Sequence, residues 1–291
     1  PISVGREVPF SFCIIFGQTE DDLKNNARFA QVMYNSRYQG FTPPSRPTVH
    51  AITGQGEVNI YWNDHAEDSR DVVTGYADFE GYKIYKSTDG GNSWNTTGLS
   101  YSVSQNKRIN KLIINPNYPD SLVAATNSGI TISPDGGSTW ISTLTGRMRD
   151  VKFKPNNPSV IYAALDASSG ASKIYRTKNG GVGWAILSGG LPTGGLDRIL
   201  LGVTPANPEV VYALIAKSDA GFYGFYKSSD AGDTWTTALD CPDPSNTGCN
   251  ILGRKTDGTS DGGQSWYDMS LAISLTNENL IYAGGINLWK S

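Results

Sequence analysis

The sequence has 291 residues and a formal net charge of −3, without any Lys/Arg-rich run. This argues against a nucleic-acid partner, because neutralising phosphates requires a clustered basic face. No stretch of about 18 apolar residues is present, so no segment is expected to span a membrane. The 33 Gly, 15 Pro and 15 Tyr against 3 Met are typical of an all-β protein with short strands and many turns.

Residues 1–44 are interpreted as the end of a preceding domain. Apolar residues alternate within 1–19, which predicts a strand in which Cys13 is a buried apolar side chain. A helix is predicted over 20–38, because acidic residues fill its first turn. We expect this helix to pack on a sheet through an apolar face formed by Leu23, Ala27, Ala30 and Tyr34.

Residues 45–87 hold three predicted strands, "PTVHAIT", "VNIYWN" and "FEGYKIYKS". Their order, with Trp62 and Tyr82 at core positions, resembles the first three strands of a fibronectin type III domain. The four strands that complete that family's fold are absent. We therefore expect either a truncated module or a join between non-contiguous segments near 83–94. The chain opens at Pro1 and breaks off inside a repeat, so it is expected to be processed or partial.

The loop over 63–81 is rich in carboxylates. Hard oxygen ligands at this density can bind calcium, with Asp64, Asp68 and Asp71 as candidate ligands. The spacing is not that of an EF-hand, so a solvated acidic loop is the alternative interpretation. The two histidines, His50 and His65, are too few for a zinc site. No other cofactor is expected.

Residues 88–291 repeat. Each unit supplies an apolar strand, a turn, two further strands, a Gly-rich turn and a fourth strand after a tryptophan. The Ser or Thr that opens each Gly-rich turn recurs at positions 87, 133, 177, 228 and 291, which are 46, 44, 51 and 63 residues apart. Four strands in about 40–50 residues predict a β-propeller blade, and roughly four blades are visible. The predicted fold is thus all-β: an incomplete propeller behind an N-terminal β-sandwich-like region that contains one helix.

The Gly-rich turns share the pattern S/T-x-D-x-G-x-x-W. A carboxylate can accept several backbone N–H groups, glycine permits a positive φ, and tryptophan buries a large surface. Asn can accept the same bonds, so we predict a structural role. The turns consist of Ser87, Asp89, Gly91 and Trp94; Ser133, Asp135, Gly137 and Trp140; Thr177, Asn179, Gly181 and Trp184; and Ser228, Asp230, Gly232 and Trp235.

This pattern resembles the Asp-box, or bacterial neuraminidase (BNR) repeat, of sialidases, sortilin-type receptors and xyloglucanase-type glycoside hydrolases. The resemblance implies turns on the outer edge of a propeller, away from its central cleft. The string "TSDGGQSWYD" over 259–268 also fits the pattern, but it precedes a first strand and is rejected as a further box. The surrounding sequence is similar to sortilin-like propellers in large secreted proteins of Bacteroidetes-type bacteria.

Cys241 and Cys249 flank a short segment rich in Pro, Asn and Gly. That composition can close as a disulfide-stapled loop, and two reduced surface thiols are the alternative. A disulfide would favour an extracellular or periplasmic setting.

Candidate catalytic groups stand near the starts of first strands. An Asp-box glycosidase requires two carboxylates that face a cleft. Asp150, Asp197 and Asp268 occupy such positions, and Arg108, Arg147, Arg149 and Arg198 lie in the same regions. Polar rings of this kind also line propellers without activity. No catalytic pair is therefore assigned, and the sialidase interpretation is disfavoured because no R-I-P signature appears.

We therefore predict a non-enzymatic secreted or cell-surface protein that mediates adhesion, surface assembly or protein/glycan binding through the propeller face. Its expected partners are other protein subunits or surface glycans, within a larger assembly. The alternatives are an endo-acting glycoside hydrolase of xyloglucanase type and a structural component of a surface layer or filament.

Overall fold

The fold is given by a computed structural model, which describes residues 14–35, 45–53, 58–63, 65–70, 85–87, 90–100, 108–166, 172–241, 247–260 and 262–291. Cys13 and most of the predicted N-terminal strand lie outside these residues. The chain divides into two compact units, one formed by 1–48 and 62–80 and the other by 49–61 and 81–291.

The first unit contains helix α1, Glu20–Asn35, and the single turn α2, His65–Asp68. Helix α1 begins after Thr19, whose Oγ1 accepts the N–H of Asp22 at 3.1 Å. No residue of α1 is buried, and Leu23 and Tyr34 are 42% and 57% exposed. The predicted helix is therefore present, and the packing of its apolar face on a sheet stays a prediction.

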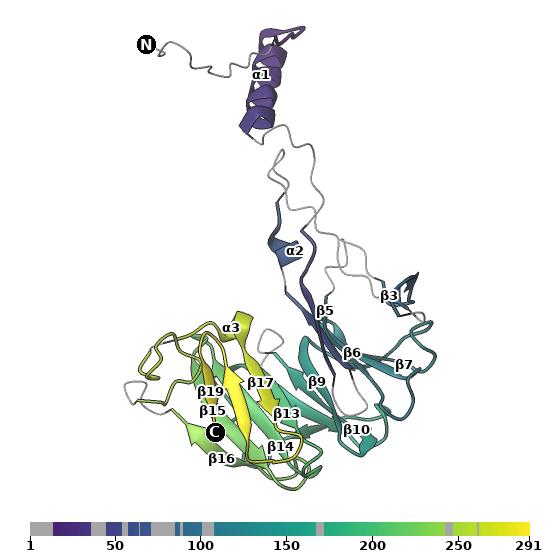
Figure 1. Cartoon of the computed structure of the whole chain (residues 1–291), viewed down its shortest axis with the longest axis vertical. Helices are drawn as coiled ribbons and strands as arrows, with labels where there is room; N and C mark the ends of the chain where they lie inside the picture. Colours follow the sequence, from purple (N-terminus) through teal and green to yellow (C-terminus); the bar gives the residue numbers. More distant parts are fainter. Residues whose placement is uncertain are drawn as a thin grey trace, which may run out of the picture. The chain divides into compact units, whose positions relative to one another are not determined.

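The second unit is built from antiparallel sheets in which strands consecutive in the chain pair with each other (Figure 1). We call the successive meanders blades 1 to 4. Blade 1 consists of β5 Ile109–Ile114, β6 Leu122–Thr126, β7 Gly129–Ser133 and β8 Ile141–Thr145. Blade 2 consists of β9 Met148–Lys154, β10 Asn157–Leu165, β11 Lys173–Thr177 and β12 Ala185–Leu187.

Blades 3 and 4 continue the same order along the chain. Blade 3 consists of β13 Leu196–Val203, β14 Val211–Lys217, β15 Phe222–Ser228 and β16 Thr236–Asp240. Blade 4 has three strands, β17 Ser270–Ile273, β18 Ile281–Gly284 and β19 Leu288–Lys290, and follows the one-turn helix α3, Ser265–Asp268. This all-β, four-blade arrangement confirms the predicted fold class.

The second strands form the densest part of the core. All five residues of β6 are buried, as are the last six of β10 and the first six of β14. Strands that are buried on both faces need small side chains where neighbouring sheets approach closely. Each of these three strands contains two alanines that are 0% exposed. Three apolar clusters fill the spaces between adjacent blades, one for each junction.

Two strands precede the blades in the chain. β1, Val49–Thr53, and β2, Val58–Trp62, are the pair expected from "PTVHAIT" and "VNIYWN". They belong to the sheet of blade 1, where β2 pairs with β5 through Ile60 and Leu112. Within the described residues, these strands therefore extend the inner edge of blade 1.

A short hairpin, β3 Tyr85–Lys86 and β4 Asn95–Thr96, surrounds the first Gly-rich turn. After β4, a Cβ on Gly98 would overlap the carbonyl oxygen of Ser138 in the turn of blade 1. After β12 of blade 2, a Cβ on Gly189 would overlap the carbonyl oxygen of Asp233, the equivalent residue of the blade 3 turn. The β3–β4 hairpin thus contacts blade 1 as the outer strands of one blade contact the next.

Candidate functional site

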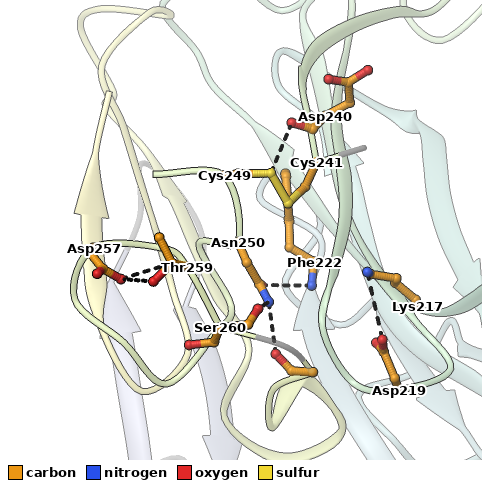
Figure 2. The surroundings of a disulfide bond; sticks show 11 residues. Lys217, Asp219, Phe222, Asp240, Cys241, Cys249, Asn250, Asp257, Thr259 and Ser260 are labelled. Carbon is orange, nitrogen blue, oxygen red and sulfur yellow. Dashed lines mark hydrogen bonds and ion pairs between the residues drawn. A yellow bond between two sulfur atoms is a disulfide. The ribbon is translucent and has the colours of Figure 1, made fainter. Parts of the chain in front are cut away.

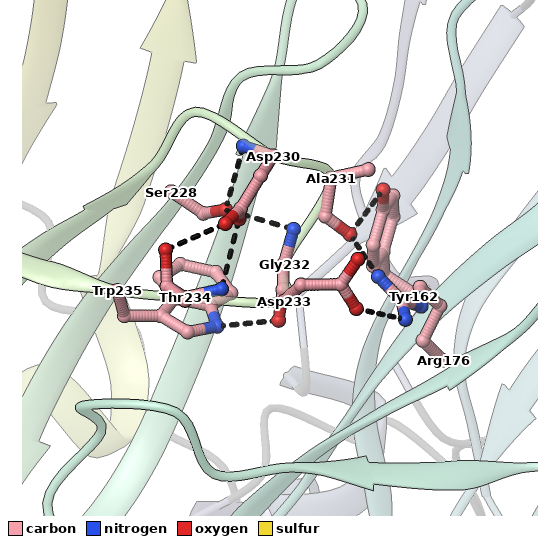
Figure 3. Close-up of polar contacts among 9 residues, drawn as sticks. All are labelled: Tyr162, Arg176, Ser228, Asp230, Ala231, Gly232, Asp233, Thr234 and Trp235. Atoms are coloured by element: carbon pink, nitrogen blue, oxygen red, sulfur yellow. Dashed lines mark hydrogen bonds and ion pairs between the residues drawn. The ribbon is translucent and has the colours of Figure 1, made fainter.

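The Gly-rich turn of blade 3 is closed by its own side chains (Figure 3). Ser228 Oγ accepts the Gly232 N–H at 2.8 Å and donates to Asp230 Oδ1 at 2.7 Å. The Asp230 carboxylate also accepts the Thr234 N–H at 2.8 Å and the Thr234 hydroxyl at 2.6 Å. These Thr234 bonds, with the Ser228 bond, lower the pKa of Asp230 to about 2. Such a carboxylate stays ionised and is fully engaged within the turn, so it is poorly suited to proton transfer.

The turns of blades 1 and 2 have the same geometry. Asp135 accepts the Thr139 N–H at 2.8 Å, and Asn179 accepts the Gly183 N–H at 3.0 Å. In the first turn, Gly91 donates its N–H to Ser87 Oγ at 2.8 Å. Asp89 lies outside the described residues.

The turn of blade 3 also contacts blade 2. Arg176 of β11 donates to the Ala231 carbonyl at 2.7 Å and to Asp233 Oδ1 at 2.5 Å, and Tyr162 of β10 donates to the same carbonyl at 3.0 Å. Figure 3 shows both side chains of blade 2 meeting at Ala231. This turn is therefore a junction between the two blades.

Asp150, in β9, is a buried link among three blades, with 1% of its surface exposed. Its carboxylate accepts Lys111 Nζ from β5 at 2.5 Å and the Leu201 N–H from β13 at 2.8 Å. Burial would raise the pKa of Asp150, but the charges of Lys111 and Lys152 outweigh burial and lower it. Of the candidate carboxylates, Asp150 is the one whose surroundings resemble a structural ion pair.

A charged cluster lies where the first strands of blades 2 and 3 begin. We define it as Arg147, Arg149, Asp166, Asp197 and Arg198. Arg149 Nε donates to Asp166 Oδ2 at 2.7 Å, and Arg147 Nε lies 3.6 Å from the same oxygen. Asp166 is only 6% exposed, so both guanidinium groups are anchored by a largely buried carboxylate.

Burial and neighbouring charges also shift the pKa values of residues in the cluster. Burial lowers the pKa of Arg198 to about 10, and the charge of Arg149 adds to this shift. Burial and the charge of Asp166 raise the pKa of Asp197. Burial lowers the pKa of Arg147, and the charges of Arg149 and of Arg108, which is not part of the cluster, add to this shift. The three guanidinium groups of the cluster thus outnumber its two carboxylates, an arrangement that favours anionic groups.

Asp268, the last residue of α3, lies beside this cluster. Burial raises the pKa of its carboxyl group, while the nearby charge of Arg198 opposes that shift. The side chain of Arg198 reaches α3 directly, because its Nη1 donates to the Ser265 carbonyl at 2.8 Å. The charge of Arg198 therefore acts on both Asp197 and Asp268. The charge of Asp150 also acts on Arg198, but the Asp150 carboxylate is hydrogen-bonded to Lys111 and to backbone.

Sequence reasoning named the four arginines, Asp197 and Asp268 but missed Asp166. Asp166 follows β10, and in an antiparallel pair the end of one strand lies next to the start of its partner. Leu165 pairs with Met148, which places Asp166 beside Arg147 and Arg149. A charged residue immediately after a predicted second strand is the signal that could have found it.

The structure pairs Cys241 with Cys249 in a disulfide, and Figure 2 shows this bond next to the end of β16. Next to it, Asn250 is fully buried and organises the segment before α3. Its amide donates to the carbonyls of Ser260 and Gly262, at 2.7 and 2.9 Å, and its Oδ1 accepts the Phe222 N–H at 3.0 Å. One amide thereby fixes this segment against β15.

Of the three predicted calcium ligands, only Asp68 lies within the described residues, as an exposed residue of α2. Asp64 and Asp71 lie outside them. Among the residues that are described, no group of three or more His, Cys, Asp or Glu side chains could hold a metal ion. Calcium binding stays a prediction. None of the helices in the described part of the chain is long and apolar enough to cross a membrane.

Comparison with solved structures gives the class of the fold. An ancestral GH74 enzyme matches with a TM-score of 0.55 and 19% identity over 84% of this chain and 28% of that one. The GH74 xyloglucanase from Xanthomonas campestris matches with a TM-score of 0.41, at 14% identity over 81% and 43% of the two chains. The Niastella koreensis GH74 enzyme matches with a TM-score of 0.43, at 16% identity over 87% and 53%.

The chain thus spans 28% to 53% of the length of these structures. The first match, at 19% identity, establishes a β-propeller fold, and the other two carry no further argument. No protein-family model matches the sequence, and no curated protein matches it either.

Proposed function

We propose that this chain is a non-enzymatic binding module, part of an Asp-box, sortilin-like β-propeller, that binds protein or glycan through the charged cluster. One observation carries the proposal: guanidinium groups outnumber carboxylates in the cluster, and Asp166 is already engaged by Arg147 and Arg149. A site with excess, anchored positive charge binds anions more readily than it cleaves a glycosidic bond.

The Asp-box assignment is supported by the turns. Three of them share Ser or Thr bonds to a glycine N–H together with an Asp or Asn oxygen that accepts a later N–H. We further propose a partial fibronectin type III-like module over 45–87, between the end of a preceding domain, 1–44, and the blades of 88–291. The strands β1 and β2 match its first two elements in the sequence, while β2 also pairs with β5 of blade 1.

An extracellular or cell-surface setting is also proposed, with a role in adhesion or surface assembly beside other subunits. Disulfides persist in oxidising compartments, so the Cys241–Cys249 bond supports this setting.

Binding to a panel of surface glycans and proteins, measured by biolayer interferometry, tests the proposal. Arg147→Met should weaken binding by about tenfold or more, because it removes a guanidinium from the site. Lys178→Met is the matched control, since Lys178 is exposed in the blade 2 turn and its loss changes net charge equally. Equal affinity of Arg147→Met and the unmodified protein, or binding to nothing in the panel, would contradict the proposal.

A glycoside hydrolase of xyloglucanase type is the second candidate. The raised pKa values of Asp197 and Asp268 favour it, because a general acid must be protonated near its working pH. This candidate predicts reducing-sugar release from β-glucans that Asp197→Asn or Asp268→Asn abolishes while the protein remains folded. Absence of release across a polysaccharide panel would eliminate it.

A further inference from the structure

Three buried polar atoms without hydrogen-bond partners gather at α3 and the start of β13. They are Arg198 Nε, Ser265 Oγ and Asp268 Oδ1, three of the four such side-chain atoms in the described part of the chain. Ser265 is 0% exposed. The Arg198 bond to the Ser265 carbonyl, at 2.8 Å, brings two of these side chains together, and the charge of Arg198 acts on the third.

Unsatisfied buried groups destabilise a folded protein, so three in one place call for a physical explanation. A guanidinium Nε–H and a hydroxyl can both donate to a carboxylate, and arginine is especially suited to this planar group. The free oxygen of Asp268 can accept a hydroxyl. The three groups together therefore match a ligand that carries a carboxylate next to hydroxyl groups.

Two exposed aromatic side chains of α3 lie between Ser265 and Asp268 in the sequence. Trp266 and Tyr267 are 58% and 44% exposed, with ring centroids 5.5 Å apart and ring planes at 51°. Exposed aromatic rings bind the apolar faces of other rings, and specificity comes from the few polar groups beside them. A pyranose ring presents such a face.

We propose that α3 and the start of β13 form a subsite for a uronic-acid-containing glycan. Arg198 and Ser265 donate to the sugar carboxylate, Asp268 accepts a sugar hydroxyl, and Trp266 and Tyr267 pack against the pyranose. The subsite deepens the proposed binding function and rests on it, because Arg147 and Arg149 of the same cluster attract the anionic chain.

The three polar atoms are covered, so the ligand reaches them only when α3 shifts. This helix is a single turn, held to its surroundings by the Arg198 bond and by the Ser265 N–H bond to the Ala220 carbonyl at 3.2 Å. Occupation of the subsite should therefore change the environment of Trp266 and its fluorescence.

Isothermal titration with oligogalacturonate tests the subsite. The methyl-esterified form of the same oligosaccharide keeps the ring and removes the charge, and polyglutamate supplies the charge without the ring. We expect the free acid to bind at least tenfold more tightly than either. Equal affinity for acid and ester, or preference for polyglutamate, would overturn the proposal.

Variants add a second readout. Ser265→Ala and Trp266→Ala should each weaken oligogalacturonate binding several-fold, and Trp266→Ala should remove the fluorescence change. Trp94→Ala is the matched control, because Trp94 is 60% exposed and lies in the β3–β4 turn. Arg198→Met should abolish binding, but its buried position can impair folding, so the Ser265 and Trp266 variants decide the outcome. Unchanged binding in both, at unchanged melting temperature, would refute the subsite.

The two proposals fail differently. Binding of another glycan or protein that depends on Arg147, without binding of oligogalacturonate, would retain the proposed function and eliminate the subsite. A protein that binds nothing in either panel would eliminate both.

Discussion

The first Gly-rich turn and the turn of blade 3 share the pattern S-x-D-x-G-x-x-W and two hydrogen bonds, yet their tryptophans differ in exposure. In both turns Ser Oγ accepts a glycine N–H at 2.8 Å, and the tryptophan Nε1 donates to a glycine carbonyl at 3.0 Å. Trp235 is nevertheless 4% exposed, whereas Trp94 is 60% exposed.

The difference arises from the preceding blade. Gly232 of the blade 3 turn lies against Leu187 and Tyr162 of blade 2, and Trp235 belongs to the apolar cluster between those blades. Around Gly91, a Cβ would meet only the ring of Trp94 among the described residues. Local sequence therefore determines the conformation of the turn, and the neighbouring blade determines how much stability its tryptophan contributes.

Truncation of the two tryptophans should give the largest contrast. Trp235→Ala removes a core side chain and should lower the free energy of unfolding by about 3–5 kcal/mol. Trp94→Ala removes an exposed one and should change it by about 0.5 kcal/mol or less. Urea unfolding followed by circular dichroism measures both. Comparable losses would show that the first turn is buried in the same way as the third.

The next largest difference is expected when the equivalent glycines of the two turns, Gly232 and Gly91, are replaced by alanine. Gly232 has φ +96° and a Cβ would crowd Leu187 Cδ1 at 2.8 Å. Gly91 has φ +93°, and among the described residues a Cβ there would meet only Trp94 Cζ2, at 3.5 Å. Gly232→Ala should cost about 2–4 kcal/mol, because left-handed strain and overpacking add. Gly91→Ala involves the strain alone, about 1–2 kcal/mol, confined to the β3–β4 hairpin. Thermal melts of the two variants compare them, and equal shifts would exclude a contribution from overpacking.

A smaller difference in stability is expected between two equivalent cationic side chains, Arg176 and Lys86. The Arg176 side chain is 7% exposed where it bonds to Ala231 and Asp233, whereas the Lys86 side chain, in the equivalent position of β3, is 46% exposed and 3.4 Å from Asp120. Arg176→Met should lower the free energy of unfolding by about 1–3 kcal/mol and Lys86→Met by about 1 kcal/mol or less. Arg176→Lys, which keeps the charge, should recover only part of the loss if the fork geometry matters.

The smallest expected effect is on the pH dependence of stability, because the turn carboxylates stabilise the fold only while they are ionised. The pKa of Asp230 is about 2 in the folded protein, below its ordinary 3.8, so the stabilisation it provides is present above pH 3.8. That contribution is lost as the pH falls through 2. Asp230→Asn copies the blade 2 turn, which has Asn179, and should make stability less dependent on pH between 5 and about 2. Urea midpoints at these two pH values test the prediction, and an unchanged slope in the variant would contradict it.

Much of the fold could be predicted because it recurs at short range. The spacing of Ser87, Ser133, Thr177 and Ser228 gave the blade period, and alternating apolar residues gave the strands. The Cys241–Cys249 spacing was informative because it allows one short loop. By contrast, the pairing of β2 with β5 and the exposure of α1 depend on contacts between distant segments.

The candidate site was predicted only in outline for the same reason. The positions of Arg147, Arg149 and Asp197 near strand starts were readable, but the burial of Asp150 was not. Its surroundings depend on Lys111 and Leu201, which are 39 and 51 residues away. A carboxylate near a strand start can face solvent or a core, and side-chain pattern alone does not distinguish them.

The position of Asp150 has a consequence for folding cooperativity. In repeat architectures whose units contact only their neighbours, terminal units can unfold one at a time. Here one buried carboxylate joins β5, β9 and β13, so detachment of blade 3 removes the Leu201 bond and exposes a Lys111–Asp150 pair of blades 1 and 2 to water. Blades 1 to 3 should consequently exchange their slowest amide protons as one cooperative unit.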